Sequence, residues 1–76
     1  MTMTIDEFII KLQEVFLEGS VKLEPDTDFR DNDEFDSLVG YSILLVIKEN
    51  FGKEMPLSVF LSCHTVEDLY NQAILL

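Results

Sequence analysis

Hydrophobic positions recur at helical spacing in the first part of the chain. Thr4 and Glu7 form a capping box, in which the threonine hydroxyl accepts from an amide three residues on and the glutamate reaches back. Gly19 is a natural stop, because a left-handed residue after the last turn costs glycine nothing. The pattern therefore predicts a first helix from Thr4 to near Gly19 whose core positions are Ile5, Phe8, Ile9, Leu12, Val15 and Phe16.

The helical period is lost from Ser20 to Asp36, where Pro25 and many acidic residues indicate a long loop. Loops beyond about 12 to 15 residues are uncommon in compact domains and are usually functional or partly structured. We expect apolar side chains to pin this loop against the core, namely Val21, Leu23, Phe29 and Phe35.

The segment from Ser37 to Phe51 is apolar at most positions and contains enough β-branched residues to pass for a buried strand. Its length favours a helix, because strands usually run roughly 4 to 8 residues, and Gly52 supplies a helix stop. A helix that is apolar on nearly every side is expected to be central and packed by neighbours all around. Gly40 inside this helix lowers the stability of the helix by about 1 kcal/mol relative to alanine. Its presence indicates that another group approaches the backbone closely.

The last third of the chain contains signals for two more helices. Pro56 is a signal for a new helix start, and residues 57–61 are enough for a short third helix. Thr65 and Asp68 form a second capping box ahead of a fourth helix with core positions at Val66, Leu69, Tyr70, Ala73 and Ile74. The sequence thus predicts an all-α fold in one domain, residues 1–76. It is a small four-helix bundle of three main helices and one short helix, with a long loop between helices one and two.

Charge narrows the range of partners. Fifteen acidic residues against five basic ones give a formal net charge of −10, which repels phosphate backbones and anionic lipid. No apolar run approaches the roughly 20 residues that span a bilayer, and the N-terminus has no signal-peptide pattern. We therefore expect no nucleic acid, no membrane insertion, a cytoplasmic location and a monomer. One cysteine cannot form an internal disulfide.

Metal binding and catalysis are both disfavoured by the spacing of the residues. An EF-hand register that begins at Asp26 fails, because it puts Arg30 at the fifth position and Ser37 at the twelfth. Zinc needs three or four ligands, whereas Cys63 and His64 are the only Cys and His residues. We expect no dedicated metal site, diffuse divalent binding to the acidic loop, and a structural role for the thiol. A 76-residue bundle also offers little concave space for tuning a carboxylate, so no catalytic residue is predicted.

The tripeptide Asp36, Ser37 and Leu38 lies between the polar loop and the apolar second helix. The simpler interpretation is a helix cap, in which Asp36 or Ser37 accepts from the first free amides. A second interpretation makes Ser37 an attachment point, since a phosphate ester there would lie at the positive end of the helix dipole.

With this tripeptide in the middle of a small acidic helical chain, the sequence resembles an acyl carrier protein over essentially all 76 residues. The motif around the serine is the specific part, and the rest is pattern: the capping box at residues 4–7, Phe29, Phe51, Pro56 and the segment 65–69. The resemblance implies that Ser37 carries 4′-phosphopantetheine, with acyl or aminoacyl groups held as thioesters. It also implies that a phosphopantetheinyl transferase, using coenzyme A and Mg²⁺, reads Asp36 and Leu38.

The chain departs from the usual carrier pattern at two places. Carriers of fatty acid synthesis commonly have a Leu-Gly pair where this chain has Asp33 and Glu34, so we expect Phe35 to take the place of that leucine. Acidic residues usually stand two and five positions after the serine, and here these positions are Val39 and Ser42. The partner face is therefore less acidic and more apolar, which favours a specialised lipid, polyketide or related pathway over housekeeping fatty acid biosynthesis.

The expected partners are enzymes of the acyl-ligase, ketosynthase or acyltransferase type, and the chain itself is not expected to be an enzyme. The predicted docking residues are Val39, Tyr41, Ser42, Glu34 and Glu49. Two other hypotheses remain open at this point: an unmodified acidic adaptor with the same fold, and a divalent-ion buffer built on the loop from Glu24 to Asp36.

Overall fold

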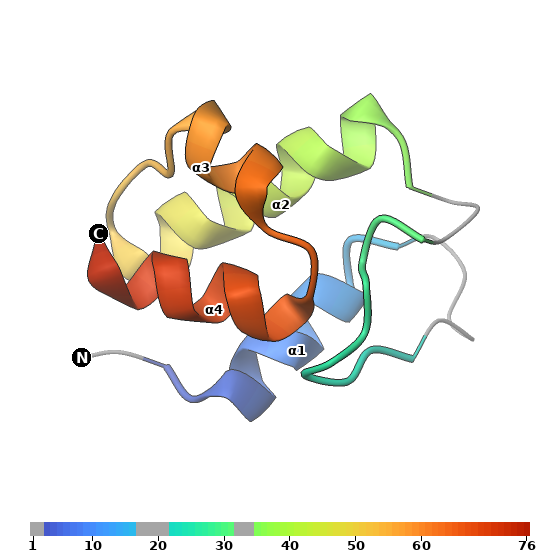
Figure 1. Cartoon of the computed structure of the whole chain (residues 1–76). Helices are drawn as coiled ribbons and strands as arrows, with labels where there is room; N and C mark the ends of the chain where they lie inside the picture. The colour runs from blue at the N-terminus through green and yellow to red at the C-terminus, as the bar shows by residue number, and fades with distance from the viewer. Residues whose placement is uncertain (1–2, 17–21, 32–34) are drawn as a thin grey trace.

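Four α-helices make up the regular structure of the computed structural model, which describes residues 3–16, 22–31 and 35–76. They are α1 (Ile5–Gln13), α2 (Ser37–Phe51), α3 (Leu57–Ser62) and α4 (Val66–Leu75). Figure 1 shows α1, α2 and α4 packed together, with the short α3 in the connection between α2 and α4. The predicted all-α bundle of three main helices and one short helix is confirmed for the described residues.

The first helix begins where the capping box predicts and ends earlier than expected. The Glu7 amide donates to Thr4 Oγ1 at 3.2 Å, and the Thr4 amide donates to Glu7 Oε1 at 2.9 Å. The helix ends at Gln13, and the amides of the next turn donate to carbonyls three residues back, which tightens the chain there. This tight turn keeps Phe16 in the core at 4% exposure without a continuous helix. Gly19 lies outside the described residues.

The second helix has the predicted bounds, and it stops at Gly52, whose φ of 75° is left-handed. The expectation that neighbours pack it on every side is wrong. Gly40, Ile43 and Ile47 are buried, whereas other large apolar side chains of α2 face solvent. An apolar helix can leave one face open in this way because nothing in its own sequence specifies how many neighbours cover it.

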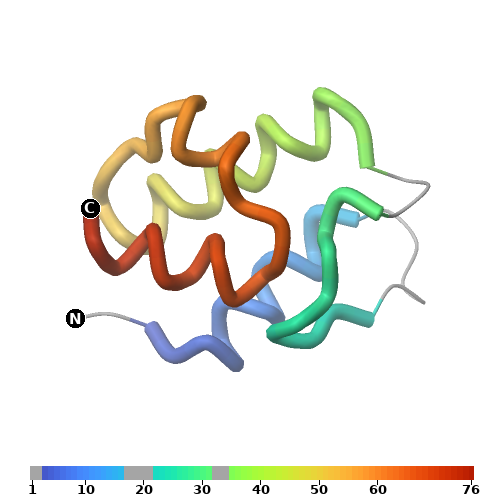
Figure 2. The backbone as a smooth tube through the Cα atoms, viewed as in Figure 1, coloured from blue at the N-terminus to red at the C-terminus, as the bar shows by residue number. Residues whose placement is uncertain are grey.

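The loop between α1 and α2 is tied to the start of α4, and Figure 2 shows its path beside that helix. The Val66 amide donates to the Thr27 carbonyl at 3.0 Å, and the Glu67 amide donates to the Pro25 carbonyl at 2.8 Å. Three of the predicted pins lie in the described residues: Leu23 and Phe29 are buried and Phe35 is half-buried against the core, while Val21 lies outside them.

The second capping box also forms as predicted. The Asp68 amide donates to Thr65 Oγ1 at 3.1 Å, and the Asp68 carboxylate accepts from the backbone amides of Thr65 and His64, each at 3.1 Å. These two amides hold the pKa of Asp68 below the usual range of an aspartate, the Thr65 amide having the larger effect. The box fixes the start of α4, and with it the point where the long loop is anchored.

Candidate functional site

Ser37 is the first residue of α2 and is exposed. Asp36 occupies the cap position before it, and its Oδ1 accepts from the Val39 amide at 2.9 Å. Of the two cap interpretations that the sequence left open, the structure selects Asp36. Ser37 therefore presents a hydroxyl at the start of the helix while its neighbour does the capping.

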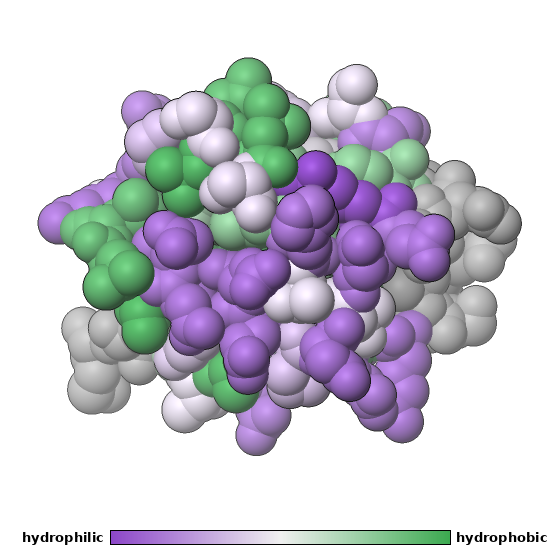
Figure 3. Space-filling view, in the orientation of Figure 1, coloured by the Kyte–Doolittle hydropathy of each residue, from purple (hydrophilic) through white to green (hydrophobic). Residues whose placement is uncertain are grey.

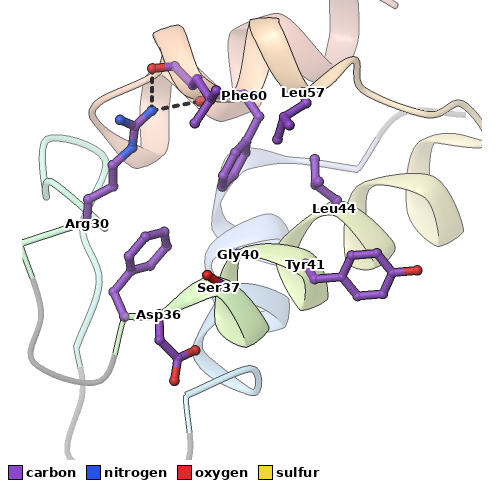
Figure 4. Close-up of a pocket in the computed structure, with 10 residues that line it drawn as sticks. Arg30, Asp36, Ser37, Gly40, Tyr41, Leu44, Leu57 and Phe60 are labelled. Carbon is purple, nitrogen blue, oxygen red and sulfur yellow. Dashed lines mark hydrogen bonds between the residues drawn. The ribbon is translucent and has the colours of Figure 1, made fainter.

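A pocket of about 510 Å³ opens beside Ser37, between α2 and α3 (Figure 4). Gly40 lies at its base, where an added Cβ would be 3.6 Å from ring atoms of both Phe35 and Phe60. The structure does not bear out the close approach predicted at Gly40, because the two rings stand at ordinary contact distance and leave room for a methyl group. The lining residues are Arg30, Phe35, Asp36, Ser37, Gly40, Tyr41, Leu44, Leu57, Phe60 and Leu61.

Arg30 joins the long loop to α3 at the edge of this pocket. Its Nη2 donates to the carbonyl oxygens of Phe60 at 2.8 Å and Leu61 at 2.6 Å, as the dashed lines in Figure 4 mark. Its guanidinium carbon lies 5.6 Å from the ring centroid of Phe29 and 5.9 Å from that of Phe60. We call these four contacts the Arg30 clamp. The Arg30 Nε is buried with no partner among the described residues, which costs about 1–3 kcal/mol.

The sequence predicted no contact for Arg30, which stood out only because it breaks an EF-hand register. A signal was present, because it is the single basic residue between Glu24 and Asp36 and it directly follows the predicted core residue Phe29. A single basic residue beside an aromatic residue in an acidic loop suggests that its side chain has a specific hydrogen-bond acceptor. The two carbonyl acceptors of Arg30, however, belong to a helix about thirty residues further along the chain. Such a pairing is visible only in the fold.

Large apolar side chains stay exposed on both sides of the pocket. On α2, Leu38 is 71% exposed, Tyr41 63% and Leu45 44%, and their spacing of three and four residues places them in one stripe. On α3, Leu57 is 60% exposed and Leu61 is 56% exposed. We call these five side chains the α2–α3 face. Figure 3 shows apolar side chains gathered over α3 and polar side chains over α4.

The predicted docking residues are distributed unevenly about this face. Tyr41 belongs to it, Glu49 is exposed further along α2, and Val39 and Ser42 are half-buried. Glu34 lies outside the described residues.

The cysteine and metal predictions concern other parts of the molecule. Cys63 is 2% exposed, and burial raises the pKa of its thiol, with Asp68 adding to the effect. His64 is exposed beside it. Within residues 3–16, 22–31 and 35–76 no group of three or more His, Cys, Asp or Glu side chains is placed to hold a metal ion. No helix in these ranges is long and apolar enough to cross a membrane.

Comparison with known protein families assigns the chain to one family. The family model described as phosphopantetheine attachment site matches residues 8–72, which is most of the chain and includes Ser37. The chain belongs to this family. It is a carrier protein in the general sense, its cofactor is 4′-phosphopantetheine, and such carrier domains work with a phosphopantetheinyl transferase and with partner enzymes. No curated protein and no solved structure matches the chain.

The surroundings of Ser37 fit a phosphopantetheine carrier. The side chain is exposed, so an external enzyme can reach it, and it stands in the first turn of a helix of fifteen residues, whose dipole favours an anion there. The adjoining pocket is lined largely by aromatic and leucine side chains, which suits an apolar group at the end of a flexible arm.

Proposed function

We propose that Ser37 is the attachment residue and that the protein presents acyl or aminoacyl thioesters to partner enzymes of a specialised lipid, polyketide or related pathway. The observation that carries the proposal is the exposed serine at the start of α2, beside an apolar pocket, in a chain of the phosphopantetheine attachment family. Tethering raises the effective concentration of the thioester at each enzyme that the carrier visits.

The attachment reaction needs only a hydroxyl from this chain. The Oγ–H bond of Ser37 is replaced by an Oγ–P bond, the 3′-phosphoadenosine 5′-phosphate half of coenzyme A leaves, and the proton passes to the transferase. We propose that the transferase recognises Asp36, which fixes the start of the helix, and Leu38, whose side chain is 71% exposed. Catalysis lies in the transferase and the partner enzymes, and the carrier itself is not an enzyme.

We propose that partner enzymes dock on the α2–α3 face. Residues 37–47 contain no charged side chain, although the chain as a whole carries a net charge of −10. An uncharged apolar face on an acidic protein suits a partner with an apolar contact area rimmed by Lys and Arg, in which Glu49 guides the approach. Because Val39 is half-buried and Leu38 and Tyr41 are exposed, the contact centres on Leu38 and Tyr41, with Val39 and Ser42 at its edge. This apolar recognition favours a dedicated pathway.

The test is the intact mass of the protein after incubation with coenzyme A, Mg²⁺ and a broad phosphopantetheinyl transferase. We expect the wild-type protein to gain one phosphopantetheinyl group and Ser37→Ala to gain none. Ser58→Ala is the matched control, because Ser58 is also an exposed serine in the first turn of a helix, and it is expected to be modified like the wild type.

The same apolar face also favours a second function, that of an unmodified adaptor that contacts other proteins through α2 and α3. A wild-type protein that several transferases leave unmodified would support the adaptor and reject the attachment proposal.

A further inference from the structure

Phe35 lies one position before Asp36, the cap residue of α2. In many helices an apolar side chain at this position packs against the side chain at the fourth position of the helix. This contact, called a hydrophobic staple, fixes the angle at which the chain enters the helix. The fourth position of α2 is Gly40, because the helix begins at Ser37. The expected partner of the Phe35 ring is thus a residue without a side chain.

The Phe35 ring nevertheless lies over that position. Its Cζ atom is 3.6 Å from the point where a Cβ of Gly40 would stand, and a ring atom of Phe60 is 3.6 Å from the same point. The Phe35 ring also meets the buried Phe29 ring edge to face, with 5.8 Å between the ring centroids and 67° between the ring planes. Aromatic rings from the long loop and from α3 therefore take the place of the missing side chain in the staple.

The segment that this staple orients is the first turn of α2, which contains Ser37. Asp36 is extended, with φ of −147° and ψ of −174°. Its Oδ1 accepts from the Val39 amide at 2.9 Å, and its carbonyl oxygen accepts from the Gly40 amide at 3.0 Å. The chain is thus held by the Phe35 ring before the cap and by these hydrogen bonds after it. Without the ring only the hydrogen bonds would remain, and helix ends with few buried contacts open easily.

We propose that Phe35 is a positioning residue for the modification of Ser37. The proposal rests on Ser37 being the attachment residue. The Ser37 Oγ must approach the phosphorus atom of coenzyme A in line with the P–O bond that breaks, while its proton passes to the transferase. A misplacement of about 1 Å can slow such a step about a hundredfold. Loss of the ring should therefore lower turnover rather than docking, because the exposed side chains of the α2–α3 face are unchanged.

The test compares alanine substitutions at the two aromatic residues that flank α2. Phe51 is the matched control, because it is also half-buried and lies at the last position of the helix. Its ring makes edge contacts with Phe8 at 5.7 Å and with Tyr70 at 6.2 Å. Loading from coenzyme A by a transferase is measured below the melting midpoints of all variants. We expect Phe35→Ala to lower kcat at least about tenfold with KM within about twofold, and Phe51→Ala to keep both near the wild-type values.

Phe35→Leu is the conservative variant, because it keeps an apolar side chain at the staple position. We expect it to recover kcat to within about threefold of the wild type. A loss confined to KM in Phe35→Ala would mean that the transferase contacts the ring directly. An equal loss of kcat in Phe51→Ala would reduce the effect to overall stability. Either result overturns the proposal.

A second measurement uses the unmodified protein. Hydrogen exchange of the Val39 and Gly40 amides reports on the first turn of α2, and exchange of the Gly52 amide reports on the last turn. We expect Phe35→Ala to speed exchange at the first turn at least about tenfold and at the last turn less than about twofold, with the reverse in Phe51→Ala. Equal acceleration at both ends in Phe35→Ala overturns the proposal.

The two measurements separate failure of this proposal from failure of the proposed function. A wild-type protein that accepts no phosphopantetheinyl group rejects the attachment itself. A wild-type protein that is loaded while Phe35→Ala is loaded equally fast rejects only the positioning role of Phe35.

Discussion

At the start of α2, adjacent side chains perform separate tasks. Asp36 caps the helix through the Val39 amide at 2.9 Å, and Ser37 is exposed beside the pocket. The prosthetic group can therefore be attached to Ser37 without removing the cap. If Ser37 is the attachment residue, as we propose, its modification leaves the Asp36 cap in place.

This division of tasks predicts different costs for two alanine substitutions. Asp36→Ala should lower the free energy of unfolding by about 0.5 to 2 kcal/mol, because the Val39 amide loses its acceptor. Ser37→Ala should lower it by less than Asp36→Ala does. Urea denaturation of the unmodified proteins measures both values, and a larger loss for Ser37→Ala would assign the cap to the serine.

Gly40 offers a second prediction at this scale. A methyl group there would meet Phe35 and Phe60 ring atoms at 3.6 Å, which is ordinary contact, so Gly40→Ala should raise the free energy of unfolding by up to about 1 kcal/mol. Gly52→Ala is the contrasting variant and should lower it, because φ at Gly52 is +75°. Urea denaturation checks both signs. A destabilised Gly40→Ala protein would mean that the two rings cannot accommodate the methyl group.

At the level of helices and loops, the sequence predicts those features that depend on residues close together in the chain. Both capping boxes, the Gly52 stop and the bounds of α2 follow from residues within a few positions of each helix end. The early end of α1, the open face of α2 and the Arg30 clamp could not be predicted in this way. Each depends on which distant segment packs nearby, and the acceptors of Arg30 belong to α3.

The capping box of α4 predicts a dependence of stability on pH. The pKa of Asp68 is lowered in the fold, so its contribution is complete above the pKa of an unfolded aspartate and is lost as the pH falls through the folded value. The difference in unfolding free energy between the wild type and Asp68→Asn should therefore be largest near neutral pH and shrink below about pH 4. Denaturation curves at several pH values measure it. A difference that is constant with pH would contradict a role for the carboxylate charge.

Across the whole molecule, charge opposes the compact state. The net charge is −10, and the segment from Glu24 to Asp36 holds seven acids and one arginine. Self-repulsion of this kind weakens as salt screens it, with a screening length of about 10 Å at 0.1 M. We expect the melting midpoint to rise with NaCl and to rise further with millimolar Mg²⁺. A midpoint that is flat in both salts would show that the fold already compensates these charges.

The central claim is that one side chain, Ser37, carries the prosthetic group. The most direct measurement is fragmentation mass spectrometry of the peptide that spans the start of α2, after loading with coenzyme A and a transferase. We predict a single phosphopantetheinyl group on Ser37 in the wild type and in Ser58→Ala. A group on any other residue, or no group at all, would contradict the assignment of Ser37.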